Sequence, residues 1–335
     1  MLLSPPPFPV VVRPLHQDNN PQLLSLLNRW VEHVPYTAHF TQRSVDQDIF
    51  GPDPSSVRGT KWVLTGQFGA WSGDDLVGFV DVATSYGSMT GHLPVGRPLG
   101  YLRFLALPLV FLPEQSSGLG TQQPALSDWI DTVAHHLLVE AERFWHRQGV
   151  RRAIAFGLDG GYPTFQAGAG TMPGEWADHF RVLTQSGFHL QDRFYCMHRP
   201  IGELLEEPMP GLRLSLVQRG SDRDRWYAVY QRAEPVAEAR LLYQNVDVPA
   251  GINPVGVLTA FHVKQAWRGK GVGKWLLRRL VNDATLQGYR RLVYHLHPDD
   301  QAAINLFTQT GFQELDFRGY VFEKEFGDQG LGIGT

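Results

Sequence analysis

The residues Val-Lys-Gln-Ala-Trp-Arg-Gly-Lys-Gly-Val-Gly-Lys occupy positions 263–274 and are the most informative part of the chain. An apolar run precedes them, their three glycines stand at alternate positions, and an amphipathic helical pattern begins directly afterwards at Trp275. Glycines let a backbone turn tightly with its N–H groups pointing inward, and a helix N-terminus adds the positive end of its dipole. The pattern therefore predicts a turn that binds an anion.

The charge around this turn supports a phosphate-bearing ligand. Six basic residues and no acidic one lie between positions 264 and 279, namely Lys264, Arg268, Lys270, Lys274, Arg278 and Arg279. The whole chain of 335 residues has a formal net charge of −3. Because a nucleic-acid-binding protein usually carries a general basic surplus, we expect no nucleic-acid partner.

The spacing of the glycines excludes two common phosphate loops. A P-loop requires Ser or Thr directly after its Gly-Lys pair, and Trp275 stands there instead. A dinucleotide fingerprint, G-x-G-x-x-G, requires a third glycine, and Lys274 or Leu276 stands at that position. The remaining pattern is R-x-x-G-x-G, formed by Arg268, Gly271 and Gly273.

This pattern resembles the pyrophosphate loop of the GCN5-related N-acetyltransferases (GNAT), and a second motif extends the resemblance. The later motif of that family, Asn-x-x-Ala-x-x-Leu-Tyr-x-x-x-Gly-Phe, corresponds here to Asp300, Ala303, Leu306, Phe307, Gly311 and Phe312. The two motifs have the separation that the family shows. Residues 212–326 are accordingly identified as a member of this family.

The resemblance implies acetyl-CoA as co-substrate, lying where the sheet opens beside the strand that ends at Val263. It implies that the N–H of Phe261 donates to the thioester carbonyl and stabilises the developing oxyanion. It assigns the pyrophosphate to the backbone of residues 268–274 and adds two residues of the later motif. The cofactor-binding residues predicted in this way are Phe261, Val263, Arg268, Gly269, Lys270, Gly271, Val272, Gly273, Lys274, Asp300 and Phe307.

Three positions depart from the family pattern and leave the proton transfers unassigned. Phe307 replaces the tyrosine that commonly protonates the thiolate of CoA, Val257 stands where a glutamate base often lies, and Asp300 replaces the motif asparagine. A thiol with a reference pKa of about 8.5 is still a tolerable leaving group. The candidate bases are His262, His295, His297, Tyr294, Tyr320 and Glu238, of which we favour His297 because it borders the acceptor side.

An internal repeat indicates two tandem domains. Residues 182–188 read Val-Leu-Thr-Gln-Ser-Gly-Phe, and residues 306–312 read Leu-Phe-Thr-Gln-Thr-Gly-Phe. Both patterns fit a helix end, a glycine cap and a closing strand, over about 192–198 and 316–324. We therefore predict a degenerate GNAT-like domain over 1–205 and a GNAT domain over 206–335, separated near the Pro/Gly segment 208–211. The arrangement is similar to that of mycothiol synthase, whose substrate we do not infer.

The predicted fold class is α/β (α+β), with a mixed, mostly antiparallel twisted sheet and flanking helices in each half. In the first half we expect helices near 21–33, 126–148 and 174–186, and a hairpin turn at 72–75. In the second half we expect helices near 221–235, 271–287 and 300–309. The first half lacks the glycine loop, and we interpret its Gly118-Leu119-Gly120 as a turn.

Composition excludes other classes. Hydrophobic residues make up 43% of the chain and charged residues 19%, which suffices for packed cores. The single cysteine, Cys196, excludes a disulfide framework, and without H-E-x-x-H or C-x-x-C motifs we expect no metal. The longest apolar stretch, 102–112, is too short for a bilayer, and residues 1–12 lack the features of a secretory signal. We expect a cytoplasmic monomer or homodimer without membrane contact.

The sequence thus favours an N-acetyltransferase that acts on a primary amine of a small molecule. Acetylation of proteins or peptides is an alternative within the same chemistry. A non-catalytic acyl-CoA sensor is an alternative of another class, because Phe307 and Val257 lack the usual proton-transferring groups.

Overall fold

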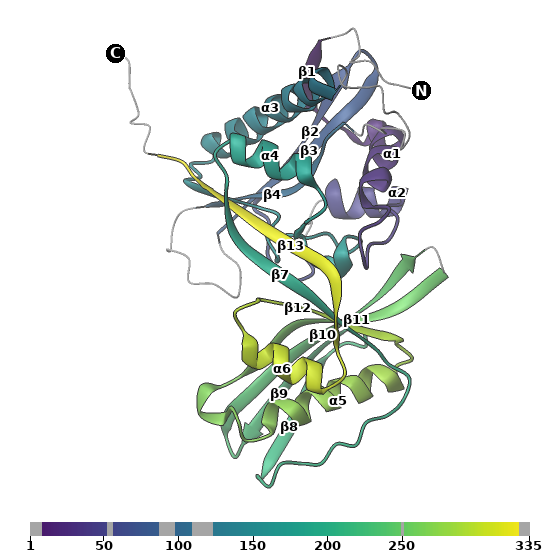
Figure 1. Ribbon diagram of the computed structural model, residues 1–335, viewed down its shortest axis with the longest axis vertical. Coiled ribbons are helices and arrows are strands. Elements are labelled where there is room, and N and C mark those ends of the chain that lie inside the picture. Colours follow the sequence, from purple (N-terminus) through teal and green to yellow (C-terminus); the bar gives the residue numbers. More distant parts are fainter. Residues whose placement is uncertain (1–8, 52–55, 87–97, 109–122, 249–250, 328–335) are drawn as a thin grey trace. The chain divides into compact units, whose positions relative to one another are not determined.

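The computed structural model of the chain describes residues 9–51, 56–86, 98–108, 123–248 and 251–327 (Figure 1). It consists of two compact units. Unit 1 comprises the residues up to Asp192 together with those from Tyr320 onwards, and unit 2 comprises Arg193–Gly319. Each unit contains a mixed sheet with helices, which confirms the predicted fold class.

Unit 1 is built from the first half of the chain. Its helices are α1 (Asn20–Val31), α2 (Gln42–Ser44), which continues into a π-helical turn (Val45–Ile49), α3 (Gln123–Arg147) and α4 (Ala177–Gln185). Its strands are β1 (Val10–Pro14), β2 (Leu64–Ser72), β3 (Asp75–Ser85), β4 (Leu99–Ala106), β5 (Arg152–Ala155) and β6 (Met172–Pro173). The helices predicted near 21–33, 126–148 and 174–186 and the hairpin turn at 72–75 are confirmed.

Unit 2 is smaller and has two helices longer than one turn, α5 (Val272–Leu286) and α6 (Gln301–Gln309). Its strands are β7 (His189–Pro200), β8 (Leu214–Gly220), β9 (Asp224–Gln231), β10 (Glu234–Val248), β11 (Gly251–Val263), β12 (Arg291–Leu296) and β13 (Gln313–Glu325), of which β7 and β13 each have one end in unit 1. The helices predicted near 271–287 and 300–309 are confirmed.

The two units repeat one strand arrangement. In unit 1, β1, β2, β3 and β4 are antiparallel neighbours and β5 joins β4 in parallel. In unit 2, β8, β9, β10 and β11 are antiparallel neighbours and β12 joins β11 in parallel. The duplication that the sequence repeat predicts is therefore present in the topology.

The closing strands of the two halves are exchanged. In unit 2, β12 pairs antiparallel with the end of β7, so that Leu296 lies opposite Tyr195. In unit 1, β5 pairs antiparallel with the end of β13, so that Ala155 lies opposite Phe322. Each sheet is thus completed by the strand that follows the last helix of the other half.

This exchange explains why the units differ from the predicted domains. The predicted boundary lies between residues 205 and 206, whereas the units change at 192/193 and again at 319/320. The segment after β7 also belongs to unit 2, because Asn282 on α5 donates to and accepts from the backbone of Leu205, at 2.7 and 2.6 Å. The Pro/Gly segment 208–211 therefore lies inside unit 2.

The helix predicted near 221–235 is wrong, since β9 and the start of β10 form a hairpin there. Arg225, Tyr227 and Val229 are buried at alternate positions, which is the period of a strand. Ser221 imitates a helix cap in the sequence, but its Oγ accepts the N–H of Asp224 within a turn. The sequence pattern Ser-x-x-Asp occurs both at helix N-termini and in turns of this kind, so it does not distinguish them.

The prediction for Gly118-Leu119-Gly120 falls outside the described residues. No helix in the described part of the chain combines the length and apolar character needed to cross a membrane.

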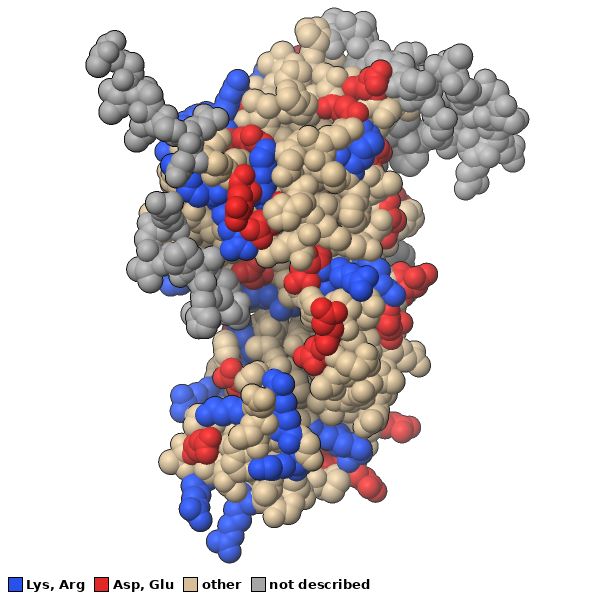
Figure 2. Space-filling model, turned by 60° about the vertical axis from the view of Figure 1, so that its left-hand side comes forward, with Lys and Arg blue, Asp and Glu red and all other residues tan. Residues whose placement is uncertain are grey.

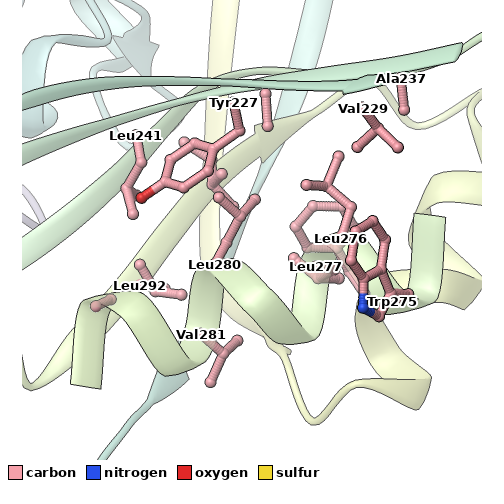
Figure 3. Packing of buried hydrophobic residues seen from close by; sticks show 14 of the residues in the cluster. Tyr227, Val229, Ala237, Leu241, Trp275, Leu276, Leu277, Leu280, Val281 and Leu292 are labelled. Atoms are coloured by element: carbon pink, nitrogen blue, oxygen red, sulfur yellow. The ribbon is translucent and has the colours of Figure 1, made fainter. Parts of the chain in front are cut away.

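Helix α5 is fixed to the sheet of unit 2 by an apolar face and a buried carboxylate. Figure 3 shows its apolar side chains beside Tyr227 and neighbouring strand residues; those labelled on the helix are Trp275, Leu276, Leu277, Leu280 and Val281. The carboxylate of Asp283 accepts from Arg225 at 2.7 Å, from the hydroxyl of Tyr243 at 2.8 Å and from that of Tyr227. Burial raises the pKa of both phenols, so they remain protonated donors.

We expect Asp283→Ala to destabilise unit 2 strongly, because it leaves the buried Arg225 guanidinium without its buried counter-charge. The expected loss is about 3–5 kcal/mol of unfolding free energy, measured by urea denaturation. The matched control is Asp222→Ala, which removes the other carboxylate on Arg225, one whose side chain is 96% exposed. A loss for Asp283→Ala no larger than for the control would contradict this role.

Candidate functional site

The sheet of unit 2 opens between β11 and β12. Their parallel pairing ends where Leu258 lies opposite Tyr294, whereas the pairing of β11 with β10 continues as far as Val263. A bulge at Thr259 accompanies the change, because Leu258 and Ala260 face consecutive residues of β10. Bulges bend a strand and increase its twist. Residues 259–263 consequently have one edge that β12 does not cover.

The ladder turns particular backbone groups toward this open edge. The N–H of Lys264 donates to the carbonyl of Val236 at 3.0 Å, and hydrogen-bonded pairs alternate with non-bonded ones in an antiparallel ladder. Phe261 and Val263 are therefore the non-bonded positions toward β10, and their N–H and C=O groups face the opening. The Nε of Arg268 donates to the carbonyl of Val263 at 3.0 Å, as this orientation requires.

The glycine segment forms a turn that ends in the N-terminus of α5. A short 3-10 helix over Gln265–Trp267 reverses the chain after β11. Gly269 and Gly271 then adopt φ values of 74° and 82°, a region that favours glycine. Gly271 caps α5, and its carbonyl accepts the N–H of Trp275 at 3.0 Å. The first-turn amides of α5 have no partner within the helix, which makes this end suited to an anion.

Gly273 brings α5 close to the open strand. A Cβ at this position would lie 3.3 Å from side-chain atoms of both Leu306 and Val263. That spacing is tighter than ordinary van der Waals contact, so a larger residue would push the helix start away from β11. The site therefore needs a glycine here for close packing, without any unusual φ value.

A cavity of about 360 Å³ follows the open edge and the glycine turn. Three elements line it: the end of β11, the turn with the start of α5, and one face of α6. The lining residues are Phe261, His262, Val263, Arg268, Gly269, Gly271, Gly273, Lys274, Asp300, Ala302, Ala303, Asn305, Leu306 and Gln309. The cavity thus combines an apolar floor, backbone donors and two basic side chains.

The six basic residues of the turn and helix have different surroundings. Arg268 and Lys274 line the cavity. Lys264 lies 3.7 Å from Glu234, Arg279 lies 3.6 Å from Glu207, and the Nζ of Lys270 lies 4.8 Å from the ring centroid of Trp267. Lys and Arg side chains gather on the surface of unit 2 in the view of Figure 2. Of the Lys and Arg residues, Arg268 and Lys274 therefore bring positive charge to the cavity directly.

Helix α6 forms one side of the cavity, and the sequence predicted only some of its lining residues. Asp300 caps this helix, and its carboxylate accepts the N–H of Ala303 at 3.0 Å. Asp300, Ala303 and Leu306 came from the family motif, whereas Ala302, Asn305 and Gln309 were missed. The missed residues stand three and four positions apart, so the helical period was the signal that could have found them.

Three residues predicted to bind the cofactor do not line the cavity. Lys270 lies over Trp267, and Val272 is fully buried. Phe307 is fully buried too, and its ring stacks on Tyr294 with centroids 4.8 Å apart and meets Phe261 edge-on at 5.5 Å. Phe307 therefore supports the open strand from behind. The ligand-binding roles predicted from the sequence stay predictions.

The candidate bases are spread over the chain. His262 is exposed, lines the cavity and lies opposite the exposed Glu238 in the register of β10 and β11. His297, which we favoured from the sequence, does not line the cavity; its Nδ1 accepts the N–H of Asp299 at 3.1 Å. His295 is buried, and Tyr294 stacks on Phe307. Tyr320 belongs to unit 1, with its ring 4.8 Å from Phe180.

Within the described residues, no group of three or more His, Cys, Asp or Glu side chains is arranged to hold a metal ion.

Comparison with known sequences connects this region with acetyltransferases. Residues 191–312 match the family model of the acetyltransferase (GNAT) family. The uncharacterized N-acetyltransferase YycN of Bacillus subtilis (strain 168) is 41% identical over 56 residues, which are 17% of this chain and 36% of that protein. The chain thus matches about a third of the length of this curated relative.

Solved structures resemble nearly the whole chain. A GCN5-related glucosamine N-acetyltransferase region of a fungal multi-domain GH3 beta-N-acetylglucosaminidase has a TM-score of 0.64 at 12% identity, covering 95% of this chain and 38% of that one. A tandem GNAT protein from the clavulanic acid biosynthesis pathway has a TM-score of 0.58 at 14% identity, covering 96% and 100%. A GCN5-related N-acetyltransferase from Sphaerobacter thermophilus scores 0.54 at 11% identity, covering 94% and 95%. At these identities the likeness concerns the fold alone.

We expect Asp300→Ala to weaken α6 at the cavity edge, because the N–H of Ala303 loses its acceptor. The expected loss is about 1 kcal/mol of unfolding free energy. Asp300→Asn keeps an N-cap acceptor without the charge and is expected to retain the stability of the parent protein. Equal losses for the two variants in urea denaturation would show that charge, and not the cap, is what matters.

Proposed function

We propose that this chain, whose residues 191–312 belong to the acetyltransferase (GNAT) family, transfers an acetyl group from acetyl-CoA to a primary amine of a small molecule. The observation that supports this most directly is the junction of an open strand edge with a glycine-capped helix N-terminus in one cavity of unit 2. An extended, amide-containing chain ending in a diphosphate fits such a junction, because the strand edge pairs with amides and the helix end with the anion.

The residues of unit 2 fit the parts of acetyl-CoA in order along the cavity. A Cβ at Gly273 would meet Leu306 and Val263 at 3.3 Å, so the glycine is needed to bring the helix start close to the open edge. The amides of the turn and the side chains of Arg268 and Lys274 would hold the diphosphate. Arg268 also donates to the carbonyl of Val263, which fixes the turn against the strand.

The N–H of Phe261 is the group placed to assist the reaction. It faces the open edge, and a donor aimed at the thioester oxygen stabilises the negative charge that develops as an amine attacks. Holding the amine and the thioester together supplies much of the remaining rate enhancement. The bond that forms is C–N, the bond that breaks is C–S, and the amine loses a proton while the thiolate gains one.

We further propose His262 as the proton acceptor, in place of His297. His262 lines the cavity next to Phe261 in the chain, and Glu238 lies opposite it in the register of β10 and β11. Val257, at the usual glutamate position, is fully buried and apolar. The departing thiolate then takes its proton from solvent, since Phe307 has no hydroxyl.

A non-catalytic acyl-CoA sensor is a second candidate. It is favoured because Val257 and Phe307 are apolar and fully buried, and so supply no group for proton transfer. An assay of CoA-thiol release with a panel of amines distinguishes the enzyme from the sensor. Glucosamine belongs in that panel because a structurally similar fungal region is named for its acetylation, and basic peptides represent the protein acceptors. Binding of acetyl-CoA without turnover on any acceptor would favour the sensor. The single cysteine agrees with a reducing, cytoplasmic setting.

Gly271→Glu is the variant that tests the ligand site. A carboxylate at the N-terminus of α5 would occupy the anion position, and we expect the Kd for acetyl-CoA to rise at least about 100-fold in calorimetry. The matched control is Gly288→Glu at the other end of the same helix, with a φ of 81° and no atom within 4 Å of an added Cβ. Wild-type affinity in Gly271→Glu would place the ligand elsewhere.

His262→Gln tests the proposed proton acceptor. We expect it to lower kcat about 100-fold, within the range for loss of a general base. The KM for acetyl-CoA should change little. His297→Gln is the comparison and should retain the kcat of the parent enzyme. The opposite ranking of the two variants would return the role to His297.

A further inference from the structure

Unit 1 contains a strand opening that corresponds residue by residue to the one in unit 2. The parallel pairing of β4 with β5 ends where Leu102 lies opposite Ala155, just as that of β11 with β12 ends at Leu258. Both strands carry a bulge directly afterwards, at Arg103 in β4 and at Thr259 in β11. Superposing these two landmarks brings Leu105 onto Phe261 and Leu107 onto Val263.

The helices beside the two openings correspond in the same way. The offset that brings Gly187 onto Gly311 also brings the first and last residues of α4 onto those of α6. The N-cap residues Trp176 and Asp300 then coincide, and their backbone angles agree, at φ −81°, ψ 66° and φ −83°, ψ 67°. By this offset His179 of α4 occupies the position of Ala303 in α6.

Side chains of unit 1 occupy the edge that is open in unit 2. The Nε2 of His179 lies 2.8 Å from the carbonyl oxygen of Leu105, and because a carbonyl only accepts, this nitrogen carries the proton. The Nε1 of Trp30 donates to the carbonyl of Leu107 at 2.8 Å. These are the two positions equivalent to Phe261 and Val263. Both carbonyls of this edge are therefore hydrogen-bonded by side chains, whereas in unit 2 Arg268 donates to the carbonyl of Val263 and Phe261 borders the cavity.

Among the described residues, His179 is closely packed between aromatic side chains. The imidazole is fully buried, and its centroid lies 4.5 Å from that of Trp30 and 4.7 Å from that of Trp176. Burial lowers the pKa of His179 to about 4, so the ring is neutral at neutral pH. In unit 2 the equivalent Ala303 has no group beyond its methyl, and it lines the cavity.

We propose that His179 and Trp30 replace the acyl-CoA ligand in unit 1, so that the chain binds one acyl-CoA, in unit 2. The residue at the third position of the helix beside the opening, alanine in α6 and histidine in α4, decides which opening accepts the ligand. This inference rests on the proposed acyl-CoA site of unit 2, and it assigns the closure of unit 1 to named side chains as well as to its missing glycine turn.

The stoichiometry of acetyl-CoA binding to the full chain tests the inference. Calorimetry and native mass spectrometry should give one equivalent for the parent protein and none for Gly271→Glu. Two equivalents, of which one survives Gly271→Glu, would overturn the inference while leaving the site of unit 2 intact. No binding by the parent protein would instead refute the proposed function, and with it the basis of the inference.

Ala303→His tests the deciding position directly. Placing the imidazole in the opening of unit 2 should raise the Kd for acetyl-CoA at least about 100-fold. Thr308→His puts the same ring on an exposed position of α6 outside the cavity lining and should keep Kd within about twofold. Circular dichroism verifies that both variants fold. Unchanged affinity in Ala303→His would overturn the inference.

His179→Ala tests the proposed role of His179 in unit 1. It removes a buried hydrogen bond and leaves a void among Trp30 and Trp176, so we expect Tm to fall by several degrees. The single equivalent of acetyl-CoA should bind with unchanged Kd, because His179 lies in unit 1. A weakened or lost equivalent in this variant would show that the ligand lies in the opening of unit 1, and would overturn the inference.

Discussion

The edge of β11 that β12 leaves uncovered is the constraint on which the rest of unit 2 depends. A parallel pair that separates leaves backbone donors and acceptors without a strand partner, and such groups must be satisfied by another means. Here the bulge at Thr259 begins the separation, Arg268 covers the carbonyl of Val263, and α5 starts close beside the edge because residue 273 is a glycine. The cavity is the space that this arrangement leaves.

The same constraint accounts for the difference between the two halves. Both units end their parallel pairing at the same register position, and the same bulge follows directly. In unit 1 an imidazole and an indole satisfy the carbonyls of Leu105 and Leu107. In unit 2 the equivalent edge borders a cavity with a basic rim. The two units thus share a strand edge whose backbone groups lack a strand partner. The side chains at a few positions determine whether that edge is covered or borders a cavity.

Local patterns in the sequence were enough to predict the parts of the fold that they encode. The glycine turn, α5, α6 and the repeat were predicted because capping residues, glycine spacing and helical period are properties of short segments. The exchange of closing strands was missed, since β7 and β13 follow the same motif and this motif does not specify which sheet each strand joins. The hairpin over β9 and β10 was also missed, because Ser221 and Asp224 fit a turn as well as a helix cap.

The candidate site was predictable to the same extent. Arg268, the three glycines, Lys274 and the motif alanine line the cavity as predicted, whereas Ala302, Asn305 and Gln309 depend on which face α6 presents. His297 lies outside the lining of this cavity, and its Nδ1 accepts the N–H of Asp299, a contact that depends on the turn after β12. The closure of unit 1 by His179 and Trp30 joins residues far apart in the sequence, so no local pattern could reveal it.

The most direct measurement is an experimental structure of the full chain with coenzyme A. The account predicts the diphosphate within hydrogen-bond distance of the amides of residues 269–274, the pantetheine amides paired with Phe261 and Val263, and the opening of unit 1 still filled by His179. A diphosphate bound away from that turn, or a pantetheine arm lying along β4, would contradict it.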